Sequence, residues 1–199
     1  MQITTDRDVG SVTTSKCSAP LSRRALIGGA IAGGAALALP LPAMAVGVEW
    51  RLAIRNVHTN ESVDAVFARS GRFVPAGLAE LNHGLRDWRT GDTIGMDRRL
   101  LALLVSLRQK LELGGNRKID LICGYRSPQT NAKLRARGGS HSGVASQSQH
   151  MLGKATDIVV PGVSLDRLRG AALALGGGGV GYYPRDGFVH VDTGRVRHW

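Results

Sequence analysis

The alternation of apolar and polar residues predicts a β-hairpin at the start of the foldable part of the chain. Between 48 and 73, two stretches rich in Val, Ile and Phe flank the turn-prone "TNES", which is the pattern of two strands joined by a short turn. After Pro75, apolar residues recur at spacings of three and four across 76–89, which predicts one helix. His83 falls outside that apolar stripe, so we expect it to face solvent.

The strongest helical pattern lies at 96–113, where leucines share one side and Asp97 is a natural N-cap. Further along, apolar runs and turn signals predict two strands, at 118–125 and 154–160, and two helices, at 127–139 and 164–177. A terminal hairpin is predicted at 179–194. Strands and helices are mixed without strict alternation in a chain of single-domain size. The pattern therefore predicts one α+β domain.

Residues 1–45 have the features of an export leader, so we expect the folded domain to cover 46–199. Arg23 and Arg24 precede a Gly-rich apolar run and small residues at a cleavage site, which is typical of a twin-arginine signal. The run at 25–41 is at the short limit of the roughly 17–25 residues of a spanning helix. We therefore expect cleavage, with no stable membrane span, rather than an anchor. Twin-arginine export carries folded proteins outward and predicts work in the periplasm.

The expected domain has a large excess of basic residues. The leader holds four of the 26 Lys plus Arg and two of the 15 Asp plus Glu, so 46–199 has 22 basic and 13 acidic residues, a formal charge of +9. Such a surface favours an anionic partner. Few aromatic residues and no recognition motif argue against nucleic acid, whereas a cell-wall polymer or anionic lipid head groups fit. A basic surface that only maintains solubility is the alternative.

Cysteine usage excludes an intramolecular disulfide in the expected domain. Cys17 lies in the leader, which leaves Cys123 as the single cysteine of 46–199. We expect Cys123, within the apolar run "IDLIC", to be a small buried residue rather than a nucleophile, because nothing in its sequence neighbourhood lowers the pKa of its thiol.

Three residues of the types that bind zinc follow a pattern that can bring them together. A catalytic zinc site uses three protein ligands and leaves the fourth position to water. His150 and Asp157 supply two candidates, from a polar loop and the strand that follows it. Strand alternation in "GFVHVDTG" puts His190 and Asp192 on the face opposite the valines. If the two strands pair, His190 converges on Asp157; taken singly, each residue is more simply a satisfied polar group.

Longer motifs carry a family resemblance. "SQHMLGKATD" matches the SxHxxGxAxD signature of zinc D-Ala-D-Ala peptidases, "FVHVD" is similar to the segment with their second histidine, and "CGYRSPQTN" resembles the turn with their substrate arginine. With its leader and its ending, the chain resembles the YcbK-like branch of murein endopeptidases. The resemblance covers most of 119–199 and implies a small antiparallel sheet with packed helices, a fold shared with hedgehog and lysostaphin-type proteins.

The resemblance also implies roles for particular residues. His150, Asp157 and His190 are the expected zinc ligands, and Arg126 is expected to hold a substrate carbonyl or carboxylate. The chemistry is consistent, because zinc acidifies water and polarises an amide carbonyl while a fixed guanidinium stabilises a tetrahedral oxyanion.

Three neighbouring residues have supporting roles in this interpretation. Ser148 is expected either to bind substrate or to orient a ligand and its loop, with an ordinary loop serine as the alternative. Tyr183 is expected to line the substrate site. Gly153 is expected to let the backbone turn between loop and strand.

The sequence departs from the family at the general base. Relatives place a His or Glu two or three residues before the last zinc histidine, where this chain has Phe188 and Gly187. Because neither accepts a proton, Asp192 is the first candidate base and His141 the second. The alternatives are an orienting role for Asp192 and a surface loop position for His141. A serine hydrolase is disfavoured, since no GxSxG elbow is present.

Motifs, leader and charge together predict a zinc murein peptidase that cuts cross-links or stem peptides of peptidoglycan. Two alternatives stay open. The missing base is consistent with a non-catalytic, zinc-containing wall-binding module, and Arg126 would serve equally well in a carboxypeptidase that trims stem ends. The sequence leaves the oligomeric state open.

Overall fold

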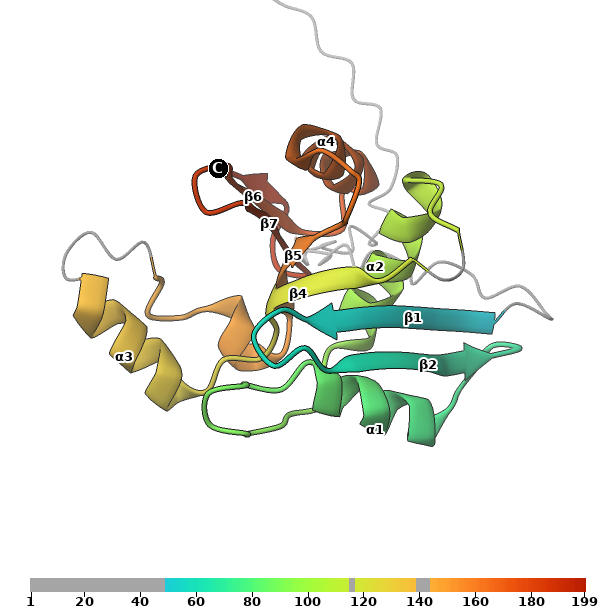
Figure 1. The fold of residues 1–199 in the computed structure, drawn as a ribbon, viewed down its shortest axis with the longest axis horizontal. Coiled ribbons are helices and arrows are strands. Elements are labelled where there is room, and N and C mark those ends of the chain that lie inside the picture. The colour runs from blue at the N-terminus through green and yellow to red at the C-terminus, as the bar shows by residue number, and fades with distance from the viewer. Residues whose placement is uncertain (1–48, 115–116, 139–143) are drawn as a thin grey trace, which may run out of the picture. The chain divides into compact units, whose positions relative to one another are not determined.

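The computed structural model describes residues 49–114, 117–138 and 144–199. The expected leader and His141 lie outside these ranges. Within them the chain forms an eight-stranded sheet in the order β3-β2-β1-β4-β5-β7-β6-β8, with helices packed against it (Figure 1). This arrangement is the α+β class that the sequence predicts.

The elements have the following bounds. The helices are α1 (Pro75–Gly84), α2 (Arg98–Lys110), α3 (Pro128–Gly138) and α4 (Leu165–Leu175), with the 3₁₀ turn η2 (Gln149–Leu152). The strands are β1 (Glu49–Asn56), β2 (Ser62–Arg69), β3 (Arg72–Phe73), β4 (Ile119–Cys123), β5 (Ala155–Val159), β6 (Gly179–Tyr183), β7 (Phe188–Asp192) and β8 (Arg197–His198).

The expected first hairpin is present, since β1 pairs antiparallel with β2. The helix after it, α1, ends at Gly84, earlier than the periodicity predicts. The Leu85 carbonyl accepts a hydrogen bond from the Tyr125 amide at 2.7 Å, so the chain makes tertiary contacts there instead of another helical turn. His83 is exposed, as expected.

The main core helix is confirmed in α2. The Asp97 side chain accepts a hydrogen bond from the Arg99 amide at 2.9 Å and so caps the helix. The leucines of the predicted stripe are all buried: Leu100, Leu101, Leu104, Leu107 and Leu111. They belong to a core that also includes one face of β5, β6 and β7.

The sheet is larger than expected and mixed rather than wholly antiparallel. β1 pairs parallel with β4, and β6 pairs parallel with β8. Parallel neighbours need a long crossover connection, and the chain between β1 and β4 contains β2, β3, α1 and α2 (Figure 1). The two-residue strands β3 and β8 are too short to produce an alternation signal in the sequence.

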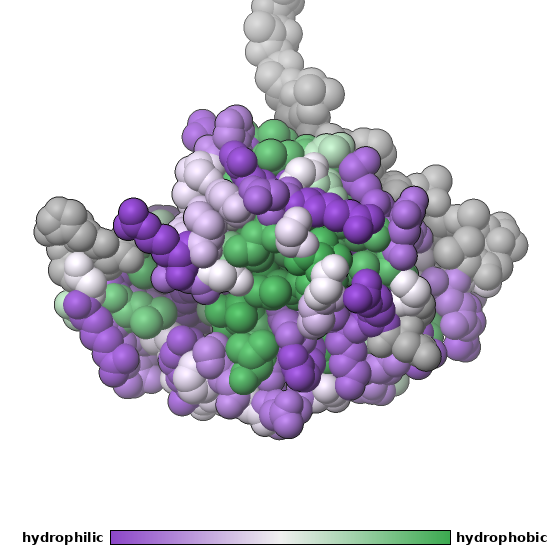
Figure 2. Space-filling model, turned by 45° about the horizontal axis from the view of Figure 1, so that its top comes forward, coloured by the Kyte–Doolittle hydropathy of each residue, from purple (hydrophilic) through white to green (hydrophobic). Residues whose placement is uncertain are grey.

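Strand alternation separates an apolar face from a polar one in the final hairpin. Val189 and Val191 of β7 pack in the core with Ile158 of β5 and Val180 of β6. The opposite face of these strands is left for polar groups. On one side of the molecule, hydrophobic residues gather at the centre with hydrophilic residues around them (Figure 2). In the described part of the chain, no helix has the length and apolar character to cross a membrane.

Candidate metal centre

Four neighbouring strands contribute one residue each to a single row across the sheet. In β4, β5, β7 and β6, the residues that stand opposite one another are Cys123, Asp157, His190 and Gly181. A register shift in β4 after Leu121 brings the cysteine into that row. Opposite residues of adjacent antiparallel strands have close side chains, so Asp157 and His190 meet in the way that strand alternation predicts.

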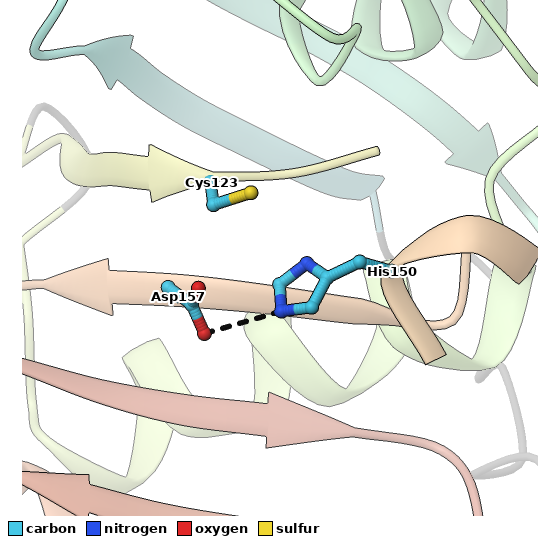
Figure 3. Close-up of side chains that lie close together, drawn as sticks. All are labelled: Cys123, His150 and Asp157. Atoms are coloured by element: carbon cyan, nitrogen blue, oxygen red, sulfur yellow. Dashed lines mark ion pairs between the residues drawn. The ribbon is translucent and has the colours of Figure 1, made fainter. Parts of the chain in front are cut away.

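His150 reaches the row from the short turn η2. The Ser148 hydroxyl accepts a hydrogen bond from the His150 amide at 3.3 Å and caps the turn. Gly153 ends it with φ 64°, in the left-handed region that glycine adopts without steric cost. The chain thereby doubles back and directs the imidazole of His150 toward Asp157 (Figure 3). Ser148 and Gly153 therefore place the histidine.

The three expected ligand atoms form a compact triangle. Asp157 Oδ1 lies 2.8 Å from His190 Nδ1 and 3.3 Å from His150 Nε2, and the two nitrogens are 3.2 Å apart. Ligands held tetrahedrally at the usual zinc bond lengths are roughly 3.3 Å from one another. All three side chains are buried, and the donor set of two imidazoles and one carboxylate fits a zinc ion.

Each imidazole has its outward nitrogen held by an acceptor. His150 Nδ1 lies 2.7 Å from the Gly124 carbonyl oxygen, to which an Nδ1–H donates. His190 Nε2 lies 3.0 Å from Asp192 Oδ2, to which an Nε2–H donates. His150 Nε2 and His190 Nδ1 are then the nitrogens that face Asp157 and would bind a metal. Metal-binding histidines in proteins are oriented in this way.

Cys123 lies beside the triangle and offers an alternative third ligand. Its Sγ and the ligand atoms of His150 and Asp157 all lie within 4.8 Å of one another, so these three are also a possible metal site (Figure 3). In the set that contains His190, the three ligand atoms are at most 3.3 Å apart. This spacing fits a single small cation more closely than the separations of up to 4.8 Å in the set that contains Cys123. The thiol is buried, as expected. Burial opposes its ionisation, but His150 and Arg126 outweigh this effect and lower the pKa of the thiol, which corrects the expectation that nothing near it does so.

The electrostatics of the three groups favour a cation among them. Burial is the largest single effect and lowers the pKa of His150, but the charges and hydrogen bonds of Asp157 and Cys123 together outweigh it and raise the pKa to about 10. Burial also opposes ionisation of Asp157, yet the neighbouring His150 and His190 hold the pKa of that carboxyl well below its usual range. The carboxylate is therefore charged at neutral pH and attracts a positive group.

Arg126 lies on the other side of the same carboxylate. Its Nη2 is 3.7 Å from Asp157 Oδ2 and 3.5 Å from Cys123 Sγ. The side chain is 12% exposed, and its Nε has no hydrogen-bond partner among the described residues. The turn after it is anchored because the amide and hydroxyl of Ser127 donate to Asp87 Oδ2 at 2.9 and 2.8 Å. Arg126 thus combines a fixed position with an unused donor.

These groups open into a cavity of about 280 Å³. Of the residues expected to contact substrate, it is lined by Arg126, Ser148 and Tyr183. The sequence interpretation missed several other lining residues, among them Gln147, Gln149, Asp186, Arg197 and Trp199. Asp186 lies in the β6–β7 turn, directly before the strand that carries His190. That position in the sequence could have indicated that Asp186 lines the cavity. Arg197 and Trp199 reach the cavity through the pairing of β8 with β6, and so short a strand leaves no alternation in the sequence from which this could be predicted.

Asp192 is fully buried and surrounded by donors. Its carboxylate accepts hydrogen bonds from the amides of Gly179 and Gly194, from the guanidinium of Arg197 and from His190 Nε2. Burial opposes its ionisation, but these donors hold the pKa of Asp192 well below its usual range. Of the two roles expected for Asp192, these contacts favour orienting His190 over accepting a proton.

Known proteins resemble the chain over most of its length. The model of the family described as "Peptidoglycan L,D-endopeptidase MepK" matches residues 45–199. The protein of that name from Escherichia coli (strain K12) is 43% identical over 180 residues, which cover 89% of this chain and 96% of the relative. A Haemophilus influenzae protein named "Probable peptidoglycan L,D-endopeptidase MepK" is 42% identical over 148 residues, which cover 74% of this chain and 77% of the relative. No solved structure matches significantly.

Proposed function

Because the chain belongs to the family of the peptidoglycan L,D-endopeptidase MepK, we propose that it is a zinc metallopeptidase that hydrolyses peptide cross-links or stem peptides of peptidoglycan. The observation that carries the proposal is the triangle of Asp157 Oδ1, His150 Nε2 and His190 Nδ1, in which no two atoms are more than 3.3 Å apart. These three side chains are the proposed ligands. Zinc supplies Lewis acidity, which polarises an amide carbonyl and acidifies water.

The chain's own residues bind and orient the substrate in this proposal. Arg126 lines the cavity and donates from its guanidinium to the carbonyl oxygen of the scissile amide. A preorganised guanidinium stabilises the negative charge that develops on that oxygen. Tyr183 and Ser148 line the cavity in which the peptide lies.

The proton acceptor is assigned to one of two residues. Asp192 is engaged with His190 and Arg197, which leaves Asp186 in the cavity wall and His141 outside the described residues. A base must lie within reach of the water that it deprotonates. Rates of Asp186→Asn and His141→Gln at retained metal content decide between the two, because only loss of the base lowers the rate by about 10²–10⁴-fold.

The proposed place of work is the cell envelope. Residues 1–45 are the proposed twin-arginine signal, with the peptidase domain at 46–199 and the periplasm as destination. The formal charge of +9 on the domain favours association with an anionic wall polymer.

A digestion of purified muropeptides tests the proposal. The domain should release products with zinc, lose activity with a chelator, and regain it when zinc is restored. Mass spectrometry of the products separates cleavage of a cross-link from trimming of a stem end, which is the carboxypeptidase alternative. No zinc-dependent product from protein with bound zinc would remove the enzymatic proposal.

One feature favours a second function, a wall-binding module without turnover. The family's base positions hold Phe188 and Gly187 in this chain. Sedimentation with purified sacculi separates the two functions, since the module would bind without releasing fragments. In that case the His190→Ala variant would bind sacculi as the unmodified protein does.

A further inference from the structure

The segment 197–199 lies against the metal centre. β8 pairs with β6, and beyond it Tyr182 N donates to Trp199 O at 3.0 Å while Trp199 N donates to Val180 O at 3.2 Å. These backbone bonds fix the segment along the strand that neighbours β7. The side chains of Arg197 and Trp199 both line the cavity, so two residues distant from the ligand motif reach the site.

Arg197 acts on a buried carboxylate that holds a ligand. Its Nη2 donates to Asp192 Oδ2 at 2.7 Å, and its Nη1 donates to Asp192 Oδ1 at 3.1 Å. Asp192 Oδ2 also accepts from His190 Nε2 at 3.0 Å. A carboxylate with 0% exposure is costly to bury without a paired charge, and the two-pronged guanidinium supplies that charge. The three side chains form one chain of hydrogen bonds that ends on the imidazole.

The indole ring of Trp199 lies next to the imidazole ring of His190. The centroids of the Trp199 and His190 rings are 5.3 Å apart, with the planes at 47°. The indole Nε1 donates to the hydroxyl of Tyr183 at 2.7 Å, and the Arg197 guanidinium lies over the indole at 4.8 Å. Gly181 faces His190 in the row across the sheet, and a Cβ there would come within 2.7 Å of the indole. The absence of a side chain at Gly181 is what admits the indole.

We propose that Arg197 and Trp199 are positioning residues of the metal centre. Arg197, through Asp192, holds His190 in the Nε2–H tautomer, and Trp199 restricts rotation of the ring, so that Nδ1 faces the ion. The inference rests on the proposed function in one respect, the assignment of His190 as a ligand. Partners that orient metal ligands typically contribute 10–100-fold to metal affinity or activity.

Metal affinity is the first test, measured for cobalt(II) and zinc by competition with a chromophoric chelator. Arg197→Gln and Trp199→Ala should each weaken binding, Arg197→Gln by about 10-fold or more. Arg197→Lys should restore part of the loss, because it keeps the charge but not the two-pronged geometry. Matched controls directly before the segment are Arg195→Gln, which removes an equal charge, and Val196→Ala, which removes apolar volume from a side chain 61% exposed. Both controls should bind metal as the unmodified protein does.

The imidazole of His190 gives a second test that needs neither metal nor activity. In ¹H–¹⁵N NMR spectra of the protein without added metal, the Nε2–H proton of His190 should exchange slowly with solvent, because it is held by the buried carboxylate of Asp192. In Arg197→Gln this proton should exchange faster, while Arg195→Gln leaves its exchange unchanged. If Arg197→Gln does not fold, Arg197→Lys and Trp199→Ala carry the same comparison.

The outcomes separate this inference from the proposed function. Unchanged metal affinity and unchanged exchange of the His190 Nε2–H proton in the folded variants would overturn the positioning role, whatever the activity on muropeptides. Weaker metal binding and faster exchange of the His190 Nε2–H proton in Arg197→Gln, together with an unmodified protein that hydrolyses no muropeptide, would support the positioning role and reject the enzymatic function.

Discussion

Asp157 divides its two carboxylate oxygens between two neighbours. Oδ1 faces the histidine nitrogens, and Oδ2 faces the Arg126 guanidinium. The Asp157 side chain thereby helps to position both the proposed ion and Arg126, the residue proposed to hold the substrate. A change at 157 is expected to affect binding of the metal and of the peptide together, whereas a change at 150 affects the metal first.

The ligand set predicts the metal content of single variants. His150→Ala and Asp157→Ala should each lose stoichiometric zinc, because a site with three protein ligands has none to spare. Cys123→Ser is the matched control, since it alters a residue next to both ligands but outside the proposed set. Elemental analysis measures the content. Zinc retained in both ligand variants, or lost from Cys123→Ser, would contradict the assignment.

The raised pKa of His150 predicts that metal binding depends on pH. With its pKa at about 10, His150 is protonated at neutral pH when no metal is bound, and a metal must displace that proton. The apparent affinity should therefore rise by about tenfold per pH unit from pH 7 to 9, with one proton released per ion. Calorimetry in buffers of different ionisation enthalpy measures the release. An affinity that does not change over this range would count against the prediction.

The same shift sets the sign for stability. A histidine whose pKa rises on folding contributes its full stabilisation below pH 6.5, and the contribution declines as pH rises through about 10. The protein without added metal should accordingly be less stable at pH 9 than at pH 6.5 so far as His150 is concerned.

Sequence reasoning selected three proposed ligands that the structure brings together, but it found few of their partners. The motif and strand alternation pointed to His150, Asp157 and His190 because these signals are local. The donors to Asp192 were not predictable, since the amide of Gly179 comes from β6 and the turn after β7 brings Gly194 and Arg197 back onto the carboxylate. These contacts favour the orienting role, one of the two that the sequence left open.

At the level of elements, the turn between β4 and α3 is held by a buried carboxylate. Asp87, from the loop after α1, accepts hydrogen bonds from the amide and hydroxyl of Ser127 and from the amide of Arg89. This loop therefore sets the position of Arg126, which directly precedes Ser127. The periodicity that extended α1 to 89 missed this contact, because the competing hydrogen bonds are tertiary.

Asp87→Asn tests that connection. The variant should lose about 1–3 kcal/mol of stability, because one buried hydrogen bond is exchanged for an unfavourable contact between donors. It should retain zinc and show a raised KM, since Arg126 is displaced while the ligands are not. The control is Asp92→Asn, an exposed carboxylate of the same loop that accepts a hydrogen bond from the Thr90 hydroxyl at 2.8 Å. Thermal unfolding, metal content and muropeptide kinetics measure the three effects; equal KM values for the two variants would contradict the connection.

Short elements limited the prediction at this scale. The hairpins and capped helices were recognisable because each has several residues of regular alternation or periodicity, as in α2 with Asp97. β3 and β8 have two residues each, and η2 has four. Such elements are set by their neighbours, and two of the three lie at the metal centre.

For the whole molecule, the proposed ion links strands that are far apart in the sequence. His150, Asp157 and His190 join η2, β5 and β7, and the core packs on the opposite face of the same strands. An ion that binds only the folded chain shifts the unfolding equilibrium by mass action. Metal content should therefore change global stability and not activity alone.

Zinc at 100 times its Kd should stabilise the domain by about 2.7 kcal/mol. For a domain of this size that corresponds to a rise in Tm of roughly 5–11 °C. A chelator should reverse the rise, and Asp157→Ala should show none. Differential scanning calorimetry measures it; an equal rise in the Asp157→Ala variant would assign the effect to another site.

The row across the sheet also protects the chemistry against misassembly. Because Val189 and Val191 flank His190, sliding β7 by one position along β5 would turn the imidazole into the core and expose both valines. Each exposed valine costs about 1.5–3 kcal/mol. Burial of the two valines thus fixes the register of β7. A correctly packed core therefore also places the His190 side chain on the face of the metal centre.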